Sequence, residues 1–409
     1  MPLRNEKVPP FFTNIPLPFK LVIKGCDMMS GDVFRCCCSA AFGLESLVAG
    51  ELRSLGLQNI STENGLVRFD SAIPEIFRCN LSLRFCDRVM IILAEGKCLS
   101  FEDLFQLVSS VPWEKYIHKD EAINVSAHCA RSKIMSPRDC QSITKKAIIE
   151  RLKARAGLRV FPETGVPFPV LVAVHSDCVR IMLNTSGDAL SRRGYRTWNG
   201  EAPIRETLAA ALVSLSPWKP GMPLCDPCCG TGTILAEAAF MAANRLPGLT
   251  RSFAMEQFYF TRGFDLNAIR REAENAVDYA NIAAIYGSDI DPEAISLAKR
   301  HMRQAGLENH VSLSVIPLQE VCLDRQNGVF VCNPPYGERL SDQAASRQLY
   351  RELHHLADRH PGWSLCAISS DPAFEKAYGM KAHKKRRLYN GRLECTYYIY
   401  YGRRNPESF

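Results

Sequence analysis

The sequence predicts an α/β protein in which a mixed α+β region precedes a domain built on a doubly wound parallel sheet. The chain has 409 residues, which is enough for two or three domains. Residues 35–180 combine short strand-like runs with amphipathic segments, a mixture typical of an α+β region. Beyond residue 180, buried strand-like runs alternate with longer helical patterns. That alternation predicts parallel strands joined by helices.

The elements of the N-terminal region follow from the spacing of its apolar residues. The run that begins at Phe34 predicts a strand, and the apolar residues that follow at helical spacing predict a helix ended by Gly56. The other expected elements are strands at 64–70, 88–98 and 121–130, helices at 101–111 and 138–157, and two strands within 168–183 around a His-Ser-Asp turn.

The C-terminal region repeats one order of elements. Residues 223–245 predict a strand, a glycine loop and a helix, and residues 283–306 predict a second unit in the same order. Further strands are expected at 328–332 and within 362–371. Because ligands of such sheets bind beyond the carboxyl ends of the strands, we expect the functional site at that edge.

Composition narrows the class of protein. The formal net charge is +7 and the pI is near 8.6, which fits an acidic partner such as nucleic acid but also a solvated basic surface. The densest basic runs are "HKKRR" at 383–387 and "SRRGYR" at 191–196. No window of eighteen apolar residues predicts a transmembrane helix, and the first residues lack the features of a secretory signal.

Cysteine usage points to a reducing compartment. The chain contains 17 cysteines, an odd number in a long chain, so a disulfide scaffold is not expected and the cytoplasm is favoured. Cys225 and Cys228 have a C-x-x-C spacing that could serve a metal or a redox pair. A zinc site would need a second pair of ligands, and no pair with convincing spacing is present. We therefore expect no metal.

The segment "DPCCGTGTILAEAA", which begins at residue 226, is the first candidate site. Gly230 and Gly232 would let the backbone turn tightly and approach a ligand, and the following helix presents free N–H groups. The pattern is neither the dinucleotide fingerprint nor a phosphate-binding loop. Asp289 ends the next strand and would suit a ribose diol, whereas Asp291 would cap a helix whose first residue is proline. Taken alone, these features could also be an ordinary turn and cap.

The segment "NPPY", residues 333–336, is the second candidate site. It ends an apolar strand that should face the same crevice as the glycine loop. The prolines would fix the Asn333 side chain and the Pro334 carbonyl, two acceptors that suit an NH₂ group. Tyr336 offers a ring on which a planar base could stack. The alternative is a simple Pro-Pro turn. In this sequence context we favour a site where an exocyclic amine of a nucleobase is positioned for alkylation.

The motifs "DPCCGTGT", "GSDID" and "CNPPYGERL", in this order, resemble the S-adenosylmethionine-dependent methyltransferases that modify exocyclic amines of nucleic-acid bases. "TSGDALSRRGYR" followed by "APIRETLAAAL" narrows the resemblance to bacterial THUMP-domain RNA methyltransferases, which include the 23S rRNA guanine-N2 methyltransferases. The resemblance covers about residues 35–405. It implies a Rossmann-like class I methyltransferase domain with a seven-stranded, doubly wound sheet, preceded by a ferredoxin-like and THUMP RNA-binding region.

The resemblance also implies domain limits and roles. The expected domains are an N-terminal extension (1–34), a ferredoxin-like part (35–75), a THUMP domain (76–183) and the methyltransferase domain (184–409). The expected S-adenosylmethionine contacts are Asp226, Pro227, Gly230, Thr231, Gly232, Thr233, Asp289 and Ile290. The expected catalytic residues are Asn333, Pro334, Pro335 and Tyr336. The expected RNA contacts are Arg192, Arg193, Tyr195, Lys384, Lys385, Arg386, Arg387 and Asn390, the last within the segment "LYNGRLEC".

One departure from the family pattern concerns the third strand of the domain. An acid is usual at its end, near the adenine amine, but this chain has Pro317, Leu318 and Gln319 there. Gln319 or Glu320 could substitute.

Three alternatives to a 23S rRNA guanine-N2 methyltransferase remain open at this point. The chain could be a tRNA guanine-N2 methyltransferase with the same architecture, or a DNA adenine-N6 methyltransferase, which shares the Asn-Pro-Pro-Tyr motif. It could also be a non-catalytic RNA-binding factor that retains only the fold. Both a monomer and a homodimer are compatible with the sequence.

Overall fold

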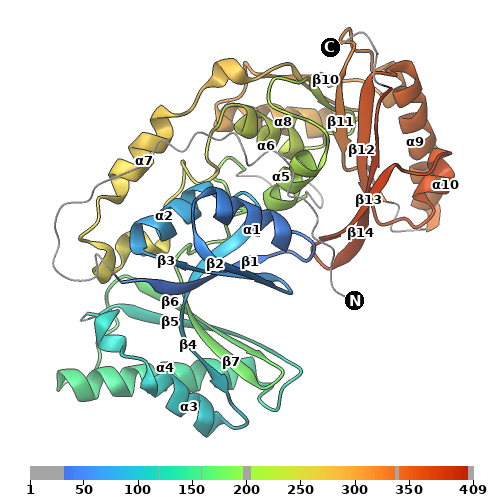
Figure 1. The fold of residues 1–409 in the computed structure, drawn as a ribbon. Helices are drawn as coiled ribbons and strands as arrows, with labels where there is room; N and C mark the ends of the chain where they lie inside the picture. Colours follow the sequence, from blue (N-terminus) through green and yellow to red (C-terminus); the bar gives the residue numbers. More distant parts are fainter. Residues whose placement is uncertain (1–31, 119, 158, 197–203, 337–339, 404–409) are drawn as a thin grey trace.

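Two seven-stranded sheets, each covered by helices, form the protein (Figure 1). The computed structural model describes residues 32–118, 120–157, 159–196, 204–336 and 340–403. The expected N-terminal extension therefore lies almost wholly outside the described residues. No helix in these ranges is long and apolar enough to cross a membrane.

The first sheet is built by the N-terminal half of the chain. Its strands are β1 (Phe34–Ala40), β2 (Gln58–Glu63), β3 (Leu66–Ser71), β4 (Cys86–Lys97), β5 (Ala122–Ala130), β6 (Pro167–His175) and β7 (Cys178–Asn184). Its helices are α1 (Glu45–Ser54), α2 (Ile73–Ser82), α3 (Phe101–Ser110) and α4 (Pro137–Ala156). The strand order is β2-β3-β1-β4-β7-β6-β5, and only β5 and β6 pair in parallel. Because β4 pairs with β1 on one side and β7 on the other, the sheet is continuous.

Most elements expected in this half are present at the predicted places. Gly157 has φ +64° and ends α4 in the left-handed conformation, as glycine does without a steric penalty. β6 and β7 flank the expected His-Ser-Asp turn. β2 was not expected from the sequence, since its residues "QNISTE" are nearly all exposed. A strand at the sheet edge with no buried face lacks the alternation on which the prediction depends.

The second sheet is built by the C-terminal half. Its strands are β8 (Leu224–Asp226), β9 (Ile285–Asp289), β10 (Val311–Val315), β11 (Gly328–Cys332), β12 (Trp363–Ser369), β13 (Lys384–Asn390) and β14 (Leu393–Tyr400). Its helices are α5 (Glu206–Leu215), α6 (Thr233–Ala242), α7 (Leu266–Asn275), α8 (Pro292–Ala305), α9 (Leu340–Arg359) and α10 (Phe374–Tyr378). The 3-10 turns of the chain are η2 (Trp113–Lys115), η3 (Ala254–Gln257), η4 (Tyr259–Thr261), η5 (Tyr279–Asn281) and η6 (Leu318–Glu320).

The second sheet is doubly wound, as predicted. α9 and α10 cover one face, and α5, α6 and α8 lie on the other (Figure 1). The order is β10-β9-β8-β11-β12-β14-β13, and the first five strands are parallel. The sequence analysis did not anticipate that β14 and β13 join antiparallel. These two strands are separated by a two-residue turn, which can connect only antiparallel neighbours.

The hairpin of β13 and β14 touches the first sheet through the loop before α1. Gly43 in this loop has φ +90°, and a Cβ atom there would lie 2.7 Å from the Arg387 carbonyl oxygen. The Phe42 ring meets the Tyr389 ring edge to face at 5.9 Å. Glu45 holds the loop, since its carboxylate accepts hydrogen bonds from the backbone N–H groups of Gly43 and Gly65 at 2.8 and 2.9 Å. The two halves of the chain therefore meet at a close backbone contact.

This contact predicts a large effect of a small substitution. Gly43→Ala should lower the free energy of unfolding by about 2–4 kcal/mol, because it adds backbone strain and a clash with Arg387. Gly157→Ala is the matched control. That glycine also has positive φ, but a Cβ atom there meets nothing within 4 Å, so strain alone should cost about 1 kcal/mol. Urea unfolding of both variants measures the difference, and equal losses would contradict a tight contact at Gly43.

Candidate active site

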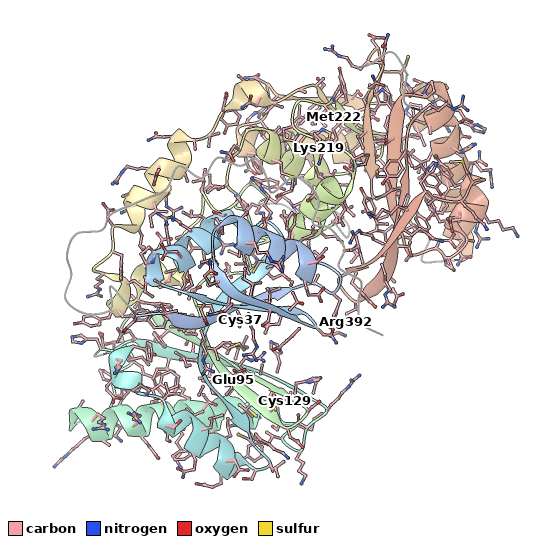
Figure 2. All side chains as sticks on the ribbon, viewed as in Figure 1. Cys37, Glu95, Cys129, Lys219, Met222 and Arg392 are labelled. Carbon is pink, nitrogen blue, oxygen red and sulfur yellow. The ribbon has the colours of Figure 1, made fainter. Side chains whose placement is uncertain are left out.

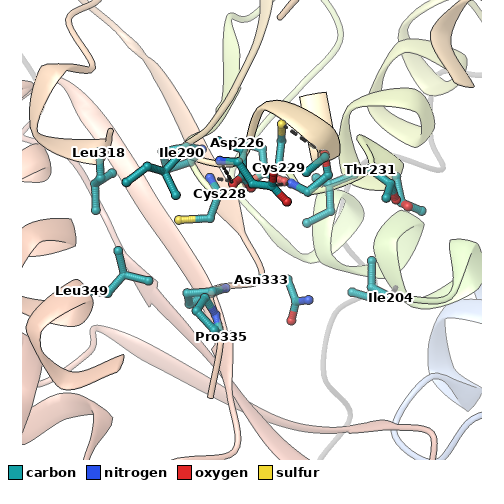
Figure 3. A pocket seen from close by; sticks show the side chains of 18 of the residues that line it. Ile204, Asp226, Cys228, Cys229, Thr231, Ile290, Leu318, Asn333, Pro335 and Leu349 are labelled. Atoms are coloured by element: carbon teal, nitrogen blue, oxygen red, sulfur yellow. Dashed lines mark hydrogen bonds between the residues drawn. The ribbon is translucent and has the colours of Figure 1, made fainter. Parts of the chain in front are cut away.

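A large pocket lies at the carboxyl ends of β8, β9 and β11 (Figure 3). β8 pairs in parallel with β9 on one side and with β11 on the other, so the three strands end side by side. The chain continues from these ends into the glycine loop, Asp289 and the Asn-Pro-Pro-Tyr segment. The predicted site residues that line the pocket are Asp226, Pro227, Gly230, Thr231, Thr233, Asp289, Ile290, Asn333, Pro334, Pro335, Tyr336 and Asn390.

The glycine loop is tied to the neighbouring strand by hydrogen bonds. The Gly230 N–H donates to Asp289 Oδ2 at 2.9 Å, and the Cys229 N–H donates to the Ser288 carbonyl at 2.9 Å. The Cys228 N–H donates to Asp226 Oδ1 at 3.1 Å. Gly230 has φ +50°, a conformation that glycine adopts most readily. The loop is thus held in one shape before any ligand binds.

The two acids of the pocket have different environments. Asp226 is only 1% exposed, and burial, together with the nearby charge of Asp289, raises its pKa well above the ordinary value. Its carboxyl is therefore suited to holding the loop as a hydrogen-bonding group. Asp289 is half-buried and accepts hydrogen bonds from the N–H groups of Gly230 and Asp291. It is the better candidate for a carboxylate that meets a polar ligand.

Gly232 has a packing role and does not line the pocket. It has φ +81°, and a Cβ atom there would lie 2.7 Å from the Met302 side chain and 3.4 Å from the Ala298 side chain. Both neighbours belong to α8. The glycine therefore allows α6 to begin close against α8, and it shapes the pocket only through that packing.

The Asn-Pro-Pro-Tyr turn is held from several sides. The Tyr336 hydroxyl donates to Asn333 Oδ1, and burial raises the pKa of Tyr336 above its ordinary range. The Tyr350 hydroxyl, from α9, donates to the Pro335 carbonyl at 3.3 Å and also bonds the Ser369 hydroxyl at 3.1 Å. Asn333 thus lines the pocket, and in this structure its side-chain oxygen accepts a hydrogen bond from the Tyr336 hydroxyl.

Part of the pocket wall near β9 and α9 is made of apolar side chains. Ile290 is 73% exposed, although it is a large aliphatic residue, and it lies near Leu318 and Leu349 in the pocket wall (Figure 3). An exposed apolar side chain in a pocket suits the face of a planar ring. Of the two candidates for the missing acid, Gln319 lines the pocket and Glu320 does not.

Several wall residues were not expected from the sequence. Arg205 precedes α5, and Ser346 and Leu349 lie on α9, far along the chain. Arg205 lies 3.9 Å from Asp87 at the end of the first sheet. Arg205 lies within "APIRETLAAAL", a segment that is part of the family resemblance. The sequence therefore held an indication that Arg205 lies near the site. The α9 residues had none, because only the packing of α9 brings them to the pocket.

The prediction that Arg193 and Tyr195 contact RNA is wrong. The side chains of Arg193 and Glu237 are 2% and 0% exposed, and they form an ion pair at 3.2 Å. The Arg193 guanidinium also donates to the carbonyls of Leu190 and Arg84. Tyr195 is buried, with its ring against Phe240. Each nitrogen of the Arg193 guanidinium donates inside the protein, and the side chain is buried, so it is not presented to a phosphate at the surface.

The other basic residues lie at the surface and keep their predicted role as a hypothesis. Arg192 is 74% exposed and lies 3.2 Å from Asp188. The run 384–387 lies on β13, at the edge of the sheet. Lys385 pairs with Glu375 at 2.8 Å, and Arg387 lies 3.9 Å from Glu394. Charged side chains on an edge strand also prevent pairing with other chains. The basic residues of β13 can therefore serve either to contact RNA or to protect the edge of the sheet.

No cluster of three or more metal-binding side chains occurs in the described parts of the chain. Burial raises the pKa of the Cys225 thiol, and it raises that of the Cys228 thiol as well. A raised pKa disfavours the thiolate that metal binding and redox exchange require. The C-x-x-C spacing is therefore best explained by packing at the end of β8.

Comparison with known proteins matches three consecutive regions of the chain. Residues 35–90 match the RlmL ferredoxin-like domain, residues 98–183 match the THUMP domain, and residues 193–399 match the RMKL-like methyltransferase domain.

Individual relatives cover most of the chain. A putative RNA methyltransferase, YpsC of Bacillus subtilis strain 168, is 38% identical over 372 residues, which are 90% of this chain and 96% of that protein. The ribosomal RNA large subunit methyltransferase K/L of Psychromonas ingrahamii is 32% identical over 87% of this chain and 48% of that protein, so the chain spans about half its length. The crystal structure of SMU.472, a putative methyltransferase complexed with SAH, has 39% identity and a TM-score of 0.87. It covers 91% of this chain and 99% of its own.

The buried Arg193–Glu237 pair allows a direct test of the corrected role of Arg193. Arg193→Met should lower the free energy of unfolding by about 3–5 kcal/mol, because it leaves Glu237 buried without its partner. Arg192→Met changes the neighbouring, exposed arginine and should shift stability by no more than about 0.5 kcal/mol. Thermal or urea unfolding of both variants measures this. If the two variants are equally stable, the structural role of Arg193 is contradicted and Arg193 is again a candidate for contact with RNA.

Proposed function

Because the chain belongs to the RMKL-like methyltransferase family, we propose that it methylates the exocyclic N2 amine of a guanosine in RNA, with 23S ribosomal RNA as the expected substrate. The observation that carries this proposal is the meeting of the glycine loop, Asp289 and Asn333 in one pocket. A cofactor site and an amine-binding turn at the same edge are what a direct transfer requires.

S-adenosylmethionine is the cofactor, as the matched family and the relative complexed with SAH indicate. When bound, it supplies an electrophilic methyl group on a sulfonium centre. The pocket fits such a ligand. Asp289 offers a carboxylate to the ribose hydroxyls, and the exposed Ile290 offers an apolar surface to the adenine ring. We propose that the glycine loop surrounds the methionine part, with Gly230 and Thr231 nearest to it.

On the acceptor side, we propose that Asn333 Oδ1 and the Pro334 carbonyl accept hydrogen bonds from the target NH₂ group. Accepting from both N–H bonds raises electron density on the nitrogen and fixes the direction of its lone pair. Positioning then lowers the barrier, and no strong general base is needed. The Tyr336 hydroxyl donates to Asn333 Oδ1 in this structure. An amide oxygen can accept two hydrogen bonds, so Asn333 Oδ1 can accept one from the target amine as well, and the Tyr336 ring is proposed to stack on the base.

The choice of RNA rests on the N-terminal half. A THUMP domain match at residues 98–183 and relatives named as RNA methyltransferases favour RNA over DNA. The domain boundaries expected from the sequence are part of this proposal: a ferredoxin-like part that ends at residue 75 and a THUMP domain that ends at residue 183. A cytoplasmic location fits the same activity. Guanine has the weakest support, because adenine also carries an amine that Asn333 could hold, and a tRNA substrate is the second candidate.

The identity of the substrate can be measured directly. Nucleosides from 23S rRNA, 16S rRNA, tRNA and DNA of a strain that lacks the protein should be compared with the parent strain by mass spectrometry. We expect loss of N2-methylguanosine in the 23S fraction alone. Loss in the tRNA fraction would instead support the second candidate. Loss of N6-methyladenine from DNA, or no loss in any fraction, would refute the proposal.

Substitutions on the cofactor side and on the acceptor side of the pocket should have different effects on cofactor affinity and on kcat. Asp289→Ala should weaken S-adenosylmethionine binding about 10- to 100-fold, since charge-assisted hydrogen bonds to the ribose are lost. Asn333→Ala should leave that affinity within about twofold and lower kcat for methylation about 100-fold, because the amine is no longer oriented. Calorimetry with the cofactor and single-turnover methylation measure the two effects. If Asn333→Ala also abolishes cofactor binding, the assigned roles are wrong.

A further inference from the structure

A small aromatic and basic surface, here called the junction surface, lies where the hairpin of β13 and β14 meets the first sheet. It consists of Phe42, Tyr389 and Arg392. Asn390, the last residue of β13, and Gly391, the first residue of the turn, line the pocket. Figure 2 shows Arg392 at the end of this hairpin, near the strands of the first sheet. The surface therefore continues from the mouth of the proposed active site onto the other half of the chain.

Phe42 keeps much of its ring in water at this place. Its side chain is 53% exposed, although one edge contacts the Tyr389 ring at 5.9 Å. A single exposed aromatic residue is common on protein surfaces. Here, however, two rings from different halves of the chain come together, and one of them, Tyr389, directly precedes Asn390 of the pocket wall. Nucleobases bind to such rings by stacking, with little dependence on sequence.

The backbone beside Phe42 is held by hydrogen bonds. Glu45 accepts from the N–H of Gly43, which follows Phe42, and from the N–H of Gly65, which lies next to the Phe42 ring. The Tyr389 hydroxyl donates to Glu394 at 2.9 Å. A rigid ring loses little entropy when a base stacks on it, and a rigid surface is what a binding site requires.

The charge of the surface suits a phosphate backbone. Arg392 is exposed at the turn, and Arg387 is 71% exposed. The acids beside this surface are Glu394, which lies 3.9 Å from Arg387, and Glu45, whose carboxylate accepts hydrogen bonds from the backbone. The contact proposed for a phosphate is therefore local, at the exposed Arg392 of the turn. Phosphates bound by such side chains fix the position of a strand without selecting its sequence.

From these observations we infer that the junction surface binds the nucleotide next to the target nucleotide, with its base stacked on Phe42 and its phosphate at Arg392. This inference rests on the proposed RNA function and adds a second contact point to it. When the target base enters the pocket, its neighbour loses a stacking partner. An aromatic ring at the pocket mouth replaces that partner, as single-stranded RNA readers do.

Base stacking and phosphate contact can be measured independently with two probes. The first probe is a fluorescently labelled 12-nucleotide oligoadenylate, and the second is a 12-unit ribose-phosphate strand without bases. Anisotropy titrations use the full chain with S-adenosylhomocysteine present. Phe42→Ala should weaken binding of the oligoadenylate about tenfold and leave the abasic strand unchanged. Arg392→Ala should weaken both probes and reduce the salt dependence of binding.

Control variants distinguish stacking from support of the fold. Phe42→Tyr keeps an aromatic ring and should bind the oligoadenylate within about twofold of the parent protein. Tyr259→Ala removes another partly exposed ring, in η4, and should change neither probe. If Phe42→Ala leaves oligoadenylate binding unchanged, or weakens both probes equally, the inference is overturned. If the parent protein binds neither probe and methylates no RNA, the proposed function fails instead.

Discussion

The parallel pairing of β8 with both β9 and β11 is the constraint on which the site depends. These pairings bring Asp226, Asp289 and Cys332 to one edge of the sheet, although each lies more than forty residues from the next along the chain. Each strand then leaves the sheet through a segment that cannot continue it: a glycine loop, an Asp-capped helix, or two prolines. The pocket exists because three different strand ends meet side by side.

The antiparallel hairpin of β13 and β14 connects this pocket to the other half of the molecule. Its turn carries Asn390 into the pocket wall, and its backbone passes so close to Gly43 that only glycine fits there. The hairpin therefore contacts both the pocket and the N-terminal half of the chain.

Buried charges add a second link between the two halves. Arg193 and Glu237 form their ion pair in the interior, and Arg193 also reaches the Arg84 carbonyl between α2 and β4. Glu51 accepts hydrogen bonds from the N–H groups of Arg84 and Phe85, and burial raises its pKa to about 7. Burying such groups is costly unless each is satisfied. Their geometry therefore permits only a narrow range of relative positions, which is consistent with a substrate that spans both halves.

The sequence by itself determined the doubly wound domain, the glycine loop, the cap at Asp291 and the Pro-Pro turn after Asn333. These depend on local rules, since glycine, proline and capping residues act on their immediate neighbours. Only the tertiary structure decided that Arg193 is buried while Arg192 is exposed, because the two have the same chemistry and differ in what packs around them. It also decided the antiparallel edge, the packing role of Gly232 and the contact of Phe42 with Tyr389. Each of these joins residues that are distant in sequence, and no local pattern specifies which distant surfaces will meet.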